Sequence, residues 1–158
     1  MEEGLYFDEY GEDWSYESEP KIITEAHIES FVELHGFQTP TFMDLNYAKN
    51  MKDYGGRMAP GLLVLCMAEG VLLQAGLTRR RGIFLMELSP VFRKPVYAND
   101  AIVNRVRLHS KRVTSKPDRG VVVTAHEVVN DAGTTVLTYR STRMIRTRQF
   151  VEPEAVTG

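Results

Sequence analysis

The chain has 158 residues, of which 43% are hydrophobic and 25% are charged, and its formal net charge is −2. This composition is typical of one globular domain with a sizeable core. It gives no electrostatic reason to expect nucleic-acid binding. Cys66 is the one cysteine, which excludes an intrachain disulfide and fits a reducing, cytoplasmic setting.

No targeting or membrane segment is expected. The first residues, MEEGLYFDEYGED, are acidic and lack the basic and apolar regions of a signal peptide. The longest apolar run, 61–75, is interrupted by Glu69. It is also shorter than the roughly 20 residues that cross a bilayer, so it is interpreted as a buried helix.

The first third of the chain predicts short strands and then a helix. Two short strands are expected around 5–10 and 14–18. Thr24 is a suitable N-cap for a helix whose apolar residues recur at helical spacing, and Gly36 is well placed to end it.

Two further helices and four strands are predicted after that. One short helix should run from Asp44 to about Lys52, and a second, apolar on nearly every face, from Gly61 to about Ala75. The following segments are rich in β-branched residues and should be strands: 83–91, 101–109, 121–129 and 134–143. Residues 130–133, NDAG, predict a hairpin turn between the last two.

This order of elements predicts an α+β domain in which an antiparallel sheet wraps around one long buried helix. We expect a single domain over residues 1–150 and a disordered tail over 151–158, where no periodicity is visible. The exposed edges of such a sheet also favour a homodimer, because unpaired edge strands bind other strands.

The segment 31–48, FVELHGFQTPTFMDLNYA, resembles the active-site segment of the MaoC-like dehydratases, the (R)-specific enoyl-CoA hydratases. That family shows roughly Gly-Asp-x-Asn-Pro-x-His-x-Asp, followed by a helix start that ends in Tyr-Ala. Gly36, Pro40, Asp44 and the pair 47–48 occupy this frame, and weaker similarities cover 6–11, 22–28, 89–96 and 99–100. The resemblance implies a hotdog fold and a role in fatty acid metabolism, with acyl-CoA or another acyl thioester as ligand.

The same resemblance places the family's catalytic Asp on Phe37 and its catalytic His on Phe42. Hydration of an enoyl thioester needs one group to activate water and one to protonate the α-carbon. Phenylalanine does neither, so enoyl-CoA hydratase activity is doubtful, while both positions are expected to line the substrate site.

Three other positions are candidate substrate-binding residues. The family's Ala-His-Gly at the start of the apolar helix is replaced by Ala-Pro-Gly, ending at Gly61. Backbone N–H groups at a helix start still favour a developing negative charge, and the resemblance places the thioester carbonyl there. Arg93 and Lys94 fall beside the expected pantetheine channel, where cations would bind phosphates of the ligand.

Glu69 is the candidate catalytic residue for a different reaction. It lies eight residues after Gly61, a spacing similar to that of hotdog thioesterases in which a carboxylate acts as nucleophile or base. A desolvated carboxylate is a suitable base. The alternative is a structural ion pair between Glu69 and Arg79, Arg80 or an arginine of a partner chain, which the overall resemblance to hydratases favours.

No metal or cofactor is expected. The four histidines are scattered at spacings that suit no metal site, and glycine-rich nucleotide-binding motifs are absent. Cys66 is expected to be a small buried hydrophobic residue.

Three functions therefore stay open: an acyl-thioester-binding protein, a thioesterase using Glu69, and a structural or regulatory dimer whose pocket is filled by Phe37 and Phe42. An open pocket without converging polar groups would favour the first, an open pocket containing Glu69 the second, and a closed pocket the third.

Overall fold

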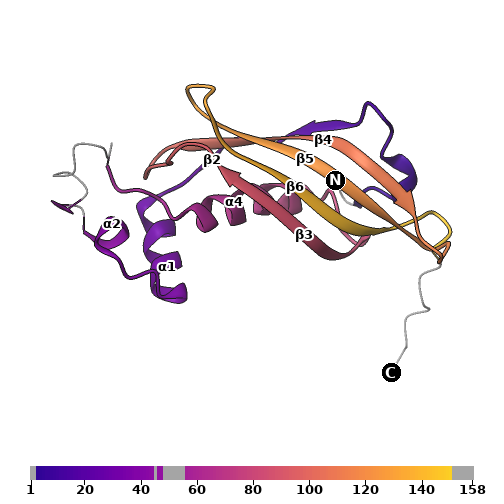
Figure 1. The fold of residues 1–158 in the computed structure, drawn as a ribbon, viewed down its shortest axis with the longest axis horizontal. Coiled ribbons are helices and arrows are strands. Elements are labelled where there is room, and N and C mark those ends of the chain that lie inside the picture. The colour runs from indigo at the N-terminus through magenta and orange to yellow at the C-terminus, as the bar shows by residue number, and fades with distance from the viewer. Residues whose placement is uncertain (1–2, 45, 48–55, 151–158) are drawn as a thin grey trace.

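The apolar segment after Pro60 forms the long helix α4, and the β-rich segments that follow fold over it. The computed structural model describes residues 3–44, 46–47 and 56–150. Figure 1 shows the sheet curving across α4, with α1 and α2 beyond one end of that helix. The helices are η1 (Phe7–Glu9, a 3-10 turn), α1 (Glu25–His35), α2 (Pro40–Met43) and α4 (Gly61–Gln74).

The described strands form one six-stranded antiparallel sheet in the order β1-β4-β5-β6-β3, with β2 also paired to β4. Its strands are β1 (Ser15–Glu17), β2 (Lys21–Ile22), β3 (Gly82–Phe92), β4 (Ala101–Val113), β5 (Arg119–Asn130) and β6 (Thr135–Arg146). The four predicted strands are thus present, and each continues past its expected C-terminal end. The predicted turn between β5 and β6 is present too, with Gly133 at a φ of 74°.

Alternation along the strands gives the sheet two different faces. On β4, Asn104 and Val106 are buried on the face toward α4, whereas Arg105 and Arg107 are exposed on the outer face. The contact with α4 is direct, because the Asn104 side-chain amide donates to the backbone oxygen of Ala68 at 2.8 Å. The sheet therefore has an apolar inner face and a charged outer face.

Helix α1 begins and ends as its sequence predicts. The Thr24 hydroxyl accepts a hydrogen bond from the His27 N–H at 3.2 Å, and Gly36 ends the helix in the left-handed conformation at φ 71°. Ile28 and Val32 are the buried residues of this helix and pack in the main core. At Asp44 the carboxylate accepts from the N–H groups of residues 46 and 47, as an N-cap does, while most of the helix predicted up to Lys52 lies outside the described residues.

The first predicted strand is wrong. Residues 5–10 contain the 3-10 turn η1, and the Leu5 N–H donates to the carbonyl of Leu77 rather than to a strand. The cause is packing: the Phe7 ring packs on β5 at Gly120, where an added Cβ would lie 2.3 Å from the ring. The second predicted strand is present as β1. Strand β2 and helix α2 are too short for their periodicity to be visible in the sequence.

Helix α4 is buried on one side and exposed on the other. Leu63, Ala68 and Leu72 pack under the sheet, whereas Leu62 and Leu73 are about half exposed. Cys66 lies on this exposed stripe, so the expectation that it is buried is wrong. When every face of a helix is apolar, the sequence does not show which face the rest of the domain covers. Within the described residues, none of the helices has both the length and the apolar composition needed to cross a membrane.

Candidate functional site

A groove of about 540 Å³ opens at the N-terminal end of α4. It brings together five of the positions singled out in the sequence: Phe37, Phe42, Gly61, Arg93 and Lys94. Its remaining described lining is apolar. It comes from the segment before α4, from α4 itself, from the end of β3 and the segment after it, and from the start of β6: Met58, Ala59, Pro60, Leu62, Val64, Phe92, Pro95, Val96 and Val136.

The floor of the groove is the start of α4. Pro60 is the N-cap, and the first bond of the helix runs from the Val64 N–H to the Pro60 oxygen at 3.2 Å. The N–H groups of residues 61–63 consequently have no partner within the helix. Gly61 lies close to the Phe92 ring, because an added Cβ would lie 3.0 Å from it. The geometry leaves backbone donors at the base of an apolar groove, where a carbonyl oxygen would be polarised.

Aromatic rings form one wall. The rings of Phe31 and Phe37 meet edge to face with centroids 5.2 Å apart, and the rings of Phe37 and Phe42 are 6.5 Å apart. Phe31, Phe37 and Phe42 all pack against the main core. Phe37 and Phe42 therefore belong both to the wall of the groove and to the core behind it, and Phe31 supports Phe37 from the core side.

Arg57 fixes the position of this wall, and sequence reasoning missed it. Its Nε donates to the Phe42 backbone oxygen at 2.8 Å, and its Nη1 donates to Glu25 and Glu29 of α1 at 2.9 and 3.0 Å. The arginine is buried. It therefore connects α1 to helix α2, which carries Phe42. No spacing pattern marks Arg57, because its partners lie 15 to 32 residues earlier in the chain.

The charge at the groove is positive and lies at its rim. Arg93 and Lys94 are exposed, and both backbone N–H groups donate to the Val136 oxygen, at 2.8 and 3.2 Å. The Arg93 side chain extends to the outer face of the sheet, where its Nε donates to the Thr138 hydroxyl at 3.2 Å. Among the described residues that line the groove there is no carboxylate and no imidazole.

Glu69 is not among the residues that line the groove. Eight residues separate it from Gly61, or about 12 Å along the helix axis. Its carboxylate is buried, accepts from the Tyr139 hydroxyl at 2.8 Å and forms an ion pair with Arg143 of β6. The predicted structural ion pair therefore exists, but its partner is Arg143 rather than Arg79 or Arg80.

Glu69 belongs to a buried polar network that the sequence did not reveal. The Asn104 side-chain amide donates to the Tyr139 hydroxyl at 2.8 Å, and the His126 ring stacks on the Tyr139 ring with centroids 4.0 Å apart. His126 contacts the Asn104 side-chain oxygen through Nδ1 at 3.3 Å and the Thr124 hydroxyl through Nε2 at 2.7 Å. Strand alternation shows which of these residues share the inner face, but their spatial convergence depends on the strand register.

Burial sets the protonation state of His126: desolvation lowers its pKa from 6.5 to about 3, so the imidazole is neutral at neutral pH. The Asn104 amide group donates to Tyr139, so the Asn104 side-chain oxygen faces His126 and accepts from Nδ1. Nε2 of the neutral ring then accepts from the Thr124 hydroxyl. Desolvation likewise raises the pKa of Tyr139, which keeps its hydroxyl protonated.

The described residues contain no group of three or more His, Cys, Asp or Glu side chains arranged to hold a metal ion. The chemical resources of the groove are therefore its backbone donors, its aromatic wall and its two rim cations.

Comparison with proteins of known structure identifies the fold. No family model and no curated protein sequence matches the chain. Among solved structures, a monoamine oxidase regulatory protein from Archaeoglobus fulgius has a TM-score of 0.82 at 28% identity, over 92% of this chain and 96% of its own. A MaoC-like dehydratase from Rhodospirillum rubrum has a TM-score of 0.82 at 20% identity, over 93% of this chain and 100% of its own.

The Mycobacterium tuberculosis protein Rv0216, which has a double hotdog fold, matches 98% of this chain over 48% of its own length, with a TM-score of 0.83 and 19% identity. The chain has the hotdog fold. Its structural neighbours are MaoC-like dehydratases and (R)-hydratases. In this hotdog domain the groove lies at the N-terminal end of the central helix, and Glu69 lies further along the same helix under the sheet.

Proposed function

We propose that this hotdog domain belongs to the MaoC-like dehydratase family and binds an acyl thioester, such as acyl-CoA, in the groove at the start of α4, without hydrating it. One observation carries the proposal: the groove combines unpaired helix N–H groups with an apolar wall and two rim cations, and its described lining has no acid or base. The N–H groups suit a thioester carbonyl, the apolar wall suits an acyl chain, and the rim cations suit phosphates.

The structural neighbours support the choice of ligand class. They include a MaoC-like dehydratase and two (R)-hydratases, and one neighbour is part of a 3R-hydroxyacyl-ACP dehydratase complex. By analogy, this chain retains the binding part of such a site. Phe37 and Phe42, which stand in the family frame for the acid–base pair, instead form the apolar wall.

Calorimetry with acyl-CoAs of two to sixteen carbons tests the proposal, alongside assays of hydration and hydrolysis. We expect binding at roughly 10 μM or tighter for at least one chain length, about −7 kcal/mol. Reversal of both rim charges, Arg93→Glu with Lys94→Glu, should weaken binding and reduce its dependence on salt. Arg112→Glu with Lys116→Glu makes the same charge change beyond the groove and serves as the control. If no acyl-CoA binds, the proposal fails and the structural-dimer function takes its place.

Thioester hydrolysis by Glu69 is the alternative activity. It requires a carboxylate that faces the thioester, whereas Glu69 lies about two turns along α4 and is engaged by Tyr139 and Arg143. The open groove also disfavours the third function, a purely structural dimer whose pocket is filled.

We also propose that the domain forms a homodimer through the free edge of β3. This strand lies at the end of the sheet order, and Phe84, Leu85 and Met86 on it are exposed. An apolar edge strand favours pairing with another strand, and a second copy of β3 would continue the sheet. The exposed stripe of α4, including Leu62 and Leu73, gives a second apolar surface that a partner could cover.

A cytoplasmic location fits the exposed thiol of Cys66.

A further inference from the structure

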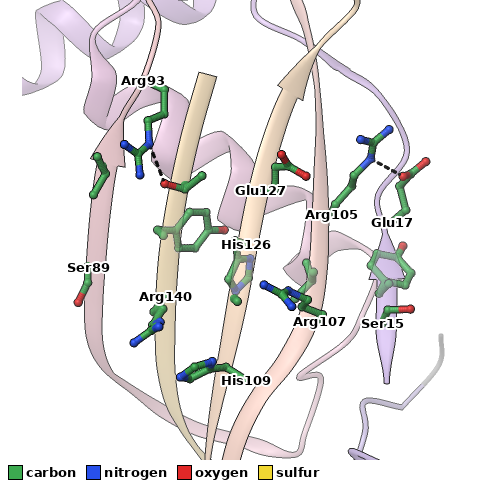
Figure 2. A pocket seen from close by; sticks show the side chains of 16 residues that line it. Ser15, Glu17, Ser89, Arg93, Arg105, Arg107, His109, His126, Glu127 and Arg140 are labelled. Atoms are coloured by element: carbon green, nitrogen blue, oxygen red, sulfur yellow. Dashed lines mark hydrogen bonds and ion pairs between the residues drawn. The ribbon is translucent and has the colours of Figure 1, made fainter. Parts of the chain in front are cut away.

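The outer face of the sheet carries a second, larger groove of about 1210 Å³, on the opposite side of the sheet from the α4 core. Figure 2 shows its side chains rising from β1, β3, β4, β5 and β6. Its described lining includes four arginines, Arg93, Arg105, Arg107 and Arg140, against two glutamates, Glu17 and Glu127. The groove is therefore electropositive in a protein whose net charge is slightly negative.

The strand register places one row of residues straight across the groove. Arg107 pairs with Ala125, and Ala125 pairs with Arg140, so the two arginines flank a small residue on the central strand. Ser15 and Ser89 complete the row at its two ends. Since neighbouring strands lie about 4.8 Å apart, the two arginine Cα atoms are separated by roughly 10 Å. Both guanidinium groups can therefore reach one small ligand above Ala125.

These two arginines differ from the others that line the groove. Arg105 is paired with Glu17 at 2.8 Å, and Arg93 donates to the Thr138 hydroxyl. Arg107 and Arg140, by contrast, have no hydrogen bond or ion pair with any other side chain in the described part of the chain. Figure 2 shows both on the outer face of the sheet, with His109 nearby. Two arginines on either side of Ala125 make the potential above this residue positive, which favours an anion there.

We propose that this row is a binding site for a phosphate-bearing ligand, held over Ala125 by Arg107 and Arg140. Guanidinium groups bind phosphate through two parallel N–H bonds, and a tetrahedral phosphate offers oxygens to two opposing arginines at once. The small side chain of Ala125 leaves room for it. Glu127, on the next row, limits the anion to a small one, because a larger acidic surface would meet that carboxylate.

The row is distinct from the acyl-thioester groove. Arg93 lines both grooves, but none of the five residues in the row lines the groove at α4. Variants at Arg107, Ala125 and Arg140 therefore test this proposal without altering the described lining of the groove at α4.

Two probes distinguish a free phosphate from a nucleotide phosphate: inorganic pyrophosphate and adenosine 3′,5′-bisphosphate, each titrated by calorimetry at low salt. We expect at least one to bind the wild-type protein. Arg107→Gln and Arg140→Gln should each weaken that binding about tenfold, as the loss of a hydrogen bond between charged groups predicts. Arg112→Gln removes an exposed arginine from the same strand outside the groove and should change binding less than about twofold.

A second variant tests the centre of the row without touching either arginine. Ala125→Glu places a carboxylate between the two guanidinium groups and should abolish binding of both probes, with the fold checked by circular dichroism. The proposal is overturned if neither probe binds the wild-type protein, if Arg112→Gln weakens binding as much as Arg107→Gln, or if Ala125→Glu still binds. A change of oligomeric state in Arg107→Gln and Arg140→Gln, without phosphate binding, would instead identify the face as a contact between copies.

Discussion

At the scale of single residues, the buried network under the sheet decides how the central helix is held. Asn104 donates both to the backbone of α4 and to Tyr139, and Tyr139 donates to Glu69. Each of these groups would be costly to bury alone, because an unpaired polar group loses its bonds to water. Together they connect α4 to β4 and β6 through bonds that only one position of the helix satisfies.

Glu69→Gln separates a structural role of this carboxylate from a catalytic one. Glutamine keeps the shape and can still accept from Tyr139, but it leaves the charge of Arg143 unpaired. We expect the free energy of unfolding to fall by about 1–3 kcal/mol, and any acyl-CoA hydrolysis to be unchanged. Glu29→Gln changes an exposed carboxylate whose buried partner, Arg57, keeps its ion pair with Glu25, and should cost less than about 1 kcal/mol. Loss of hydrolysis with unchanged stability in Glu69→Gln would support the thioesterase alternative.

His126 predicts a specific pH dependence of stability. Its folded pKa of about 3 lies below the ordinary value of 6.5, so between these values the unfolded chain binds a proton that the folded protein does not. Its contribution to stability is therefore complete above pH 6.5 and declines as the pH falls toward 3, by at most about 1.4 kcal/mol per pH unit.

Urea unfolding from pH 7 to pH 4 measures this slope. In His126→Gln the decline should be shallower than in the wild-type protein, although the variant is less stable at neutral pH because its network is altered. His109→Gln removes an exposed histidine and should leave the wild-type slope intact. An equal slope in His126→Gln and the wild-type protein would contradict the prediction.

At the scale of elements, two glycines of α4 should respond differently to substitution by alanine: one variant should weaken ligand binding, and the other should raise the free energy of unfolding. A Cβ at Gly61 would lie 3.0 Å from the Phe92 ring and push it into the groove, whereas a Cβ at Gly70 would meet no atom within 4 Å. Gly61→Ala should weaken acyl-CoA binding by about threefold to tenfold, the effect of roughly 1 kcal/mol of overpacking. Gly70→Ala should leave binding unchanged and raise the free energy of unfolding by about 0.5–1 kcal/mol, measured by urea unfolding.

The edge strand β3 carries the prediction on assembly. Phe84→Lys places a charge on the exposed apolar edge, where Phe84 is 53% exposed. If β3 pairs with its copy, this change should convert the dimer to a monomer in light scattering at micromolar concentration. Leu34→Lys, on α1 at 78% exposure, makes a similar change away from the edge and should leave the dimer intact. A wild-type protein that is monomeric under these conditions would refute the proposed assembly.

The elements that the sequence predicts well are those whose evidence is local. The cap at Thr24, the glycine at Gly36 and the β-branched runs after residue 82 each act through neighbours in the chain. The features it missed depend on distant partners. The 3-10 turn at Phe7 follows from packing on Gly120, and the exposure of Cys66 follows from the side of α4 that the sheet covers.

The same division applies to the candidate site. The family frame and the helix start selected Phe37, Phe42, Gly61, Arg93 and Lys94, which the fold brings to one groove. Periodicity carries no information on Arg57, whose three partners lie in two other elements, nor on the ion pair between Glu69 and Arg143, 74 residues apart. Partners separated in sequence are determined by strand register and helix placement, which only the folded chain specifies.

At the scale of the whole molecule, the fold separates the groove at α4 from the buried acid–base groups. The groove at α4 has helix N–H groups and apolar walls, while the carboxylate and imidazole of Glu69 and His126 are held in the network under the sheet. The carboxylate is paired with Arg143 and the imidazole is kept neutral by burial. Neither is placed to exchange a proton with a ligand in the groove.

This separation gives the last prediction, on enoyl-CoA hydration. A general acid and a general base each contribute about 10²–10⁴-fold in rate, so a groove that lacks both should be slower than a complete site by several orders of magnitude. We expect turnover of crotonyl-CoA well below about one per second even at concentrations that saturate binding. Stopped-flow absorbance at the enoyl thioester band measures hydration, and calorimetry on the same preparation shows that the ligand binds. Binding with negligible hydration is the combination that the groove predicts, whereas turnover at or above one per second would mean that an acid–base group other than those lining the described groove reaches the ligand.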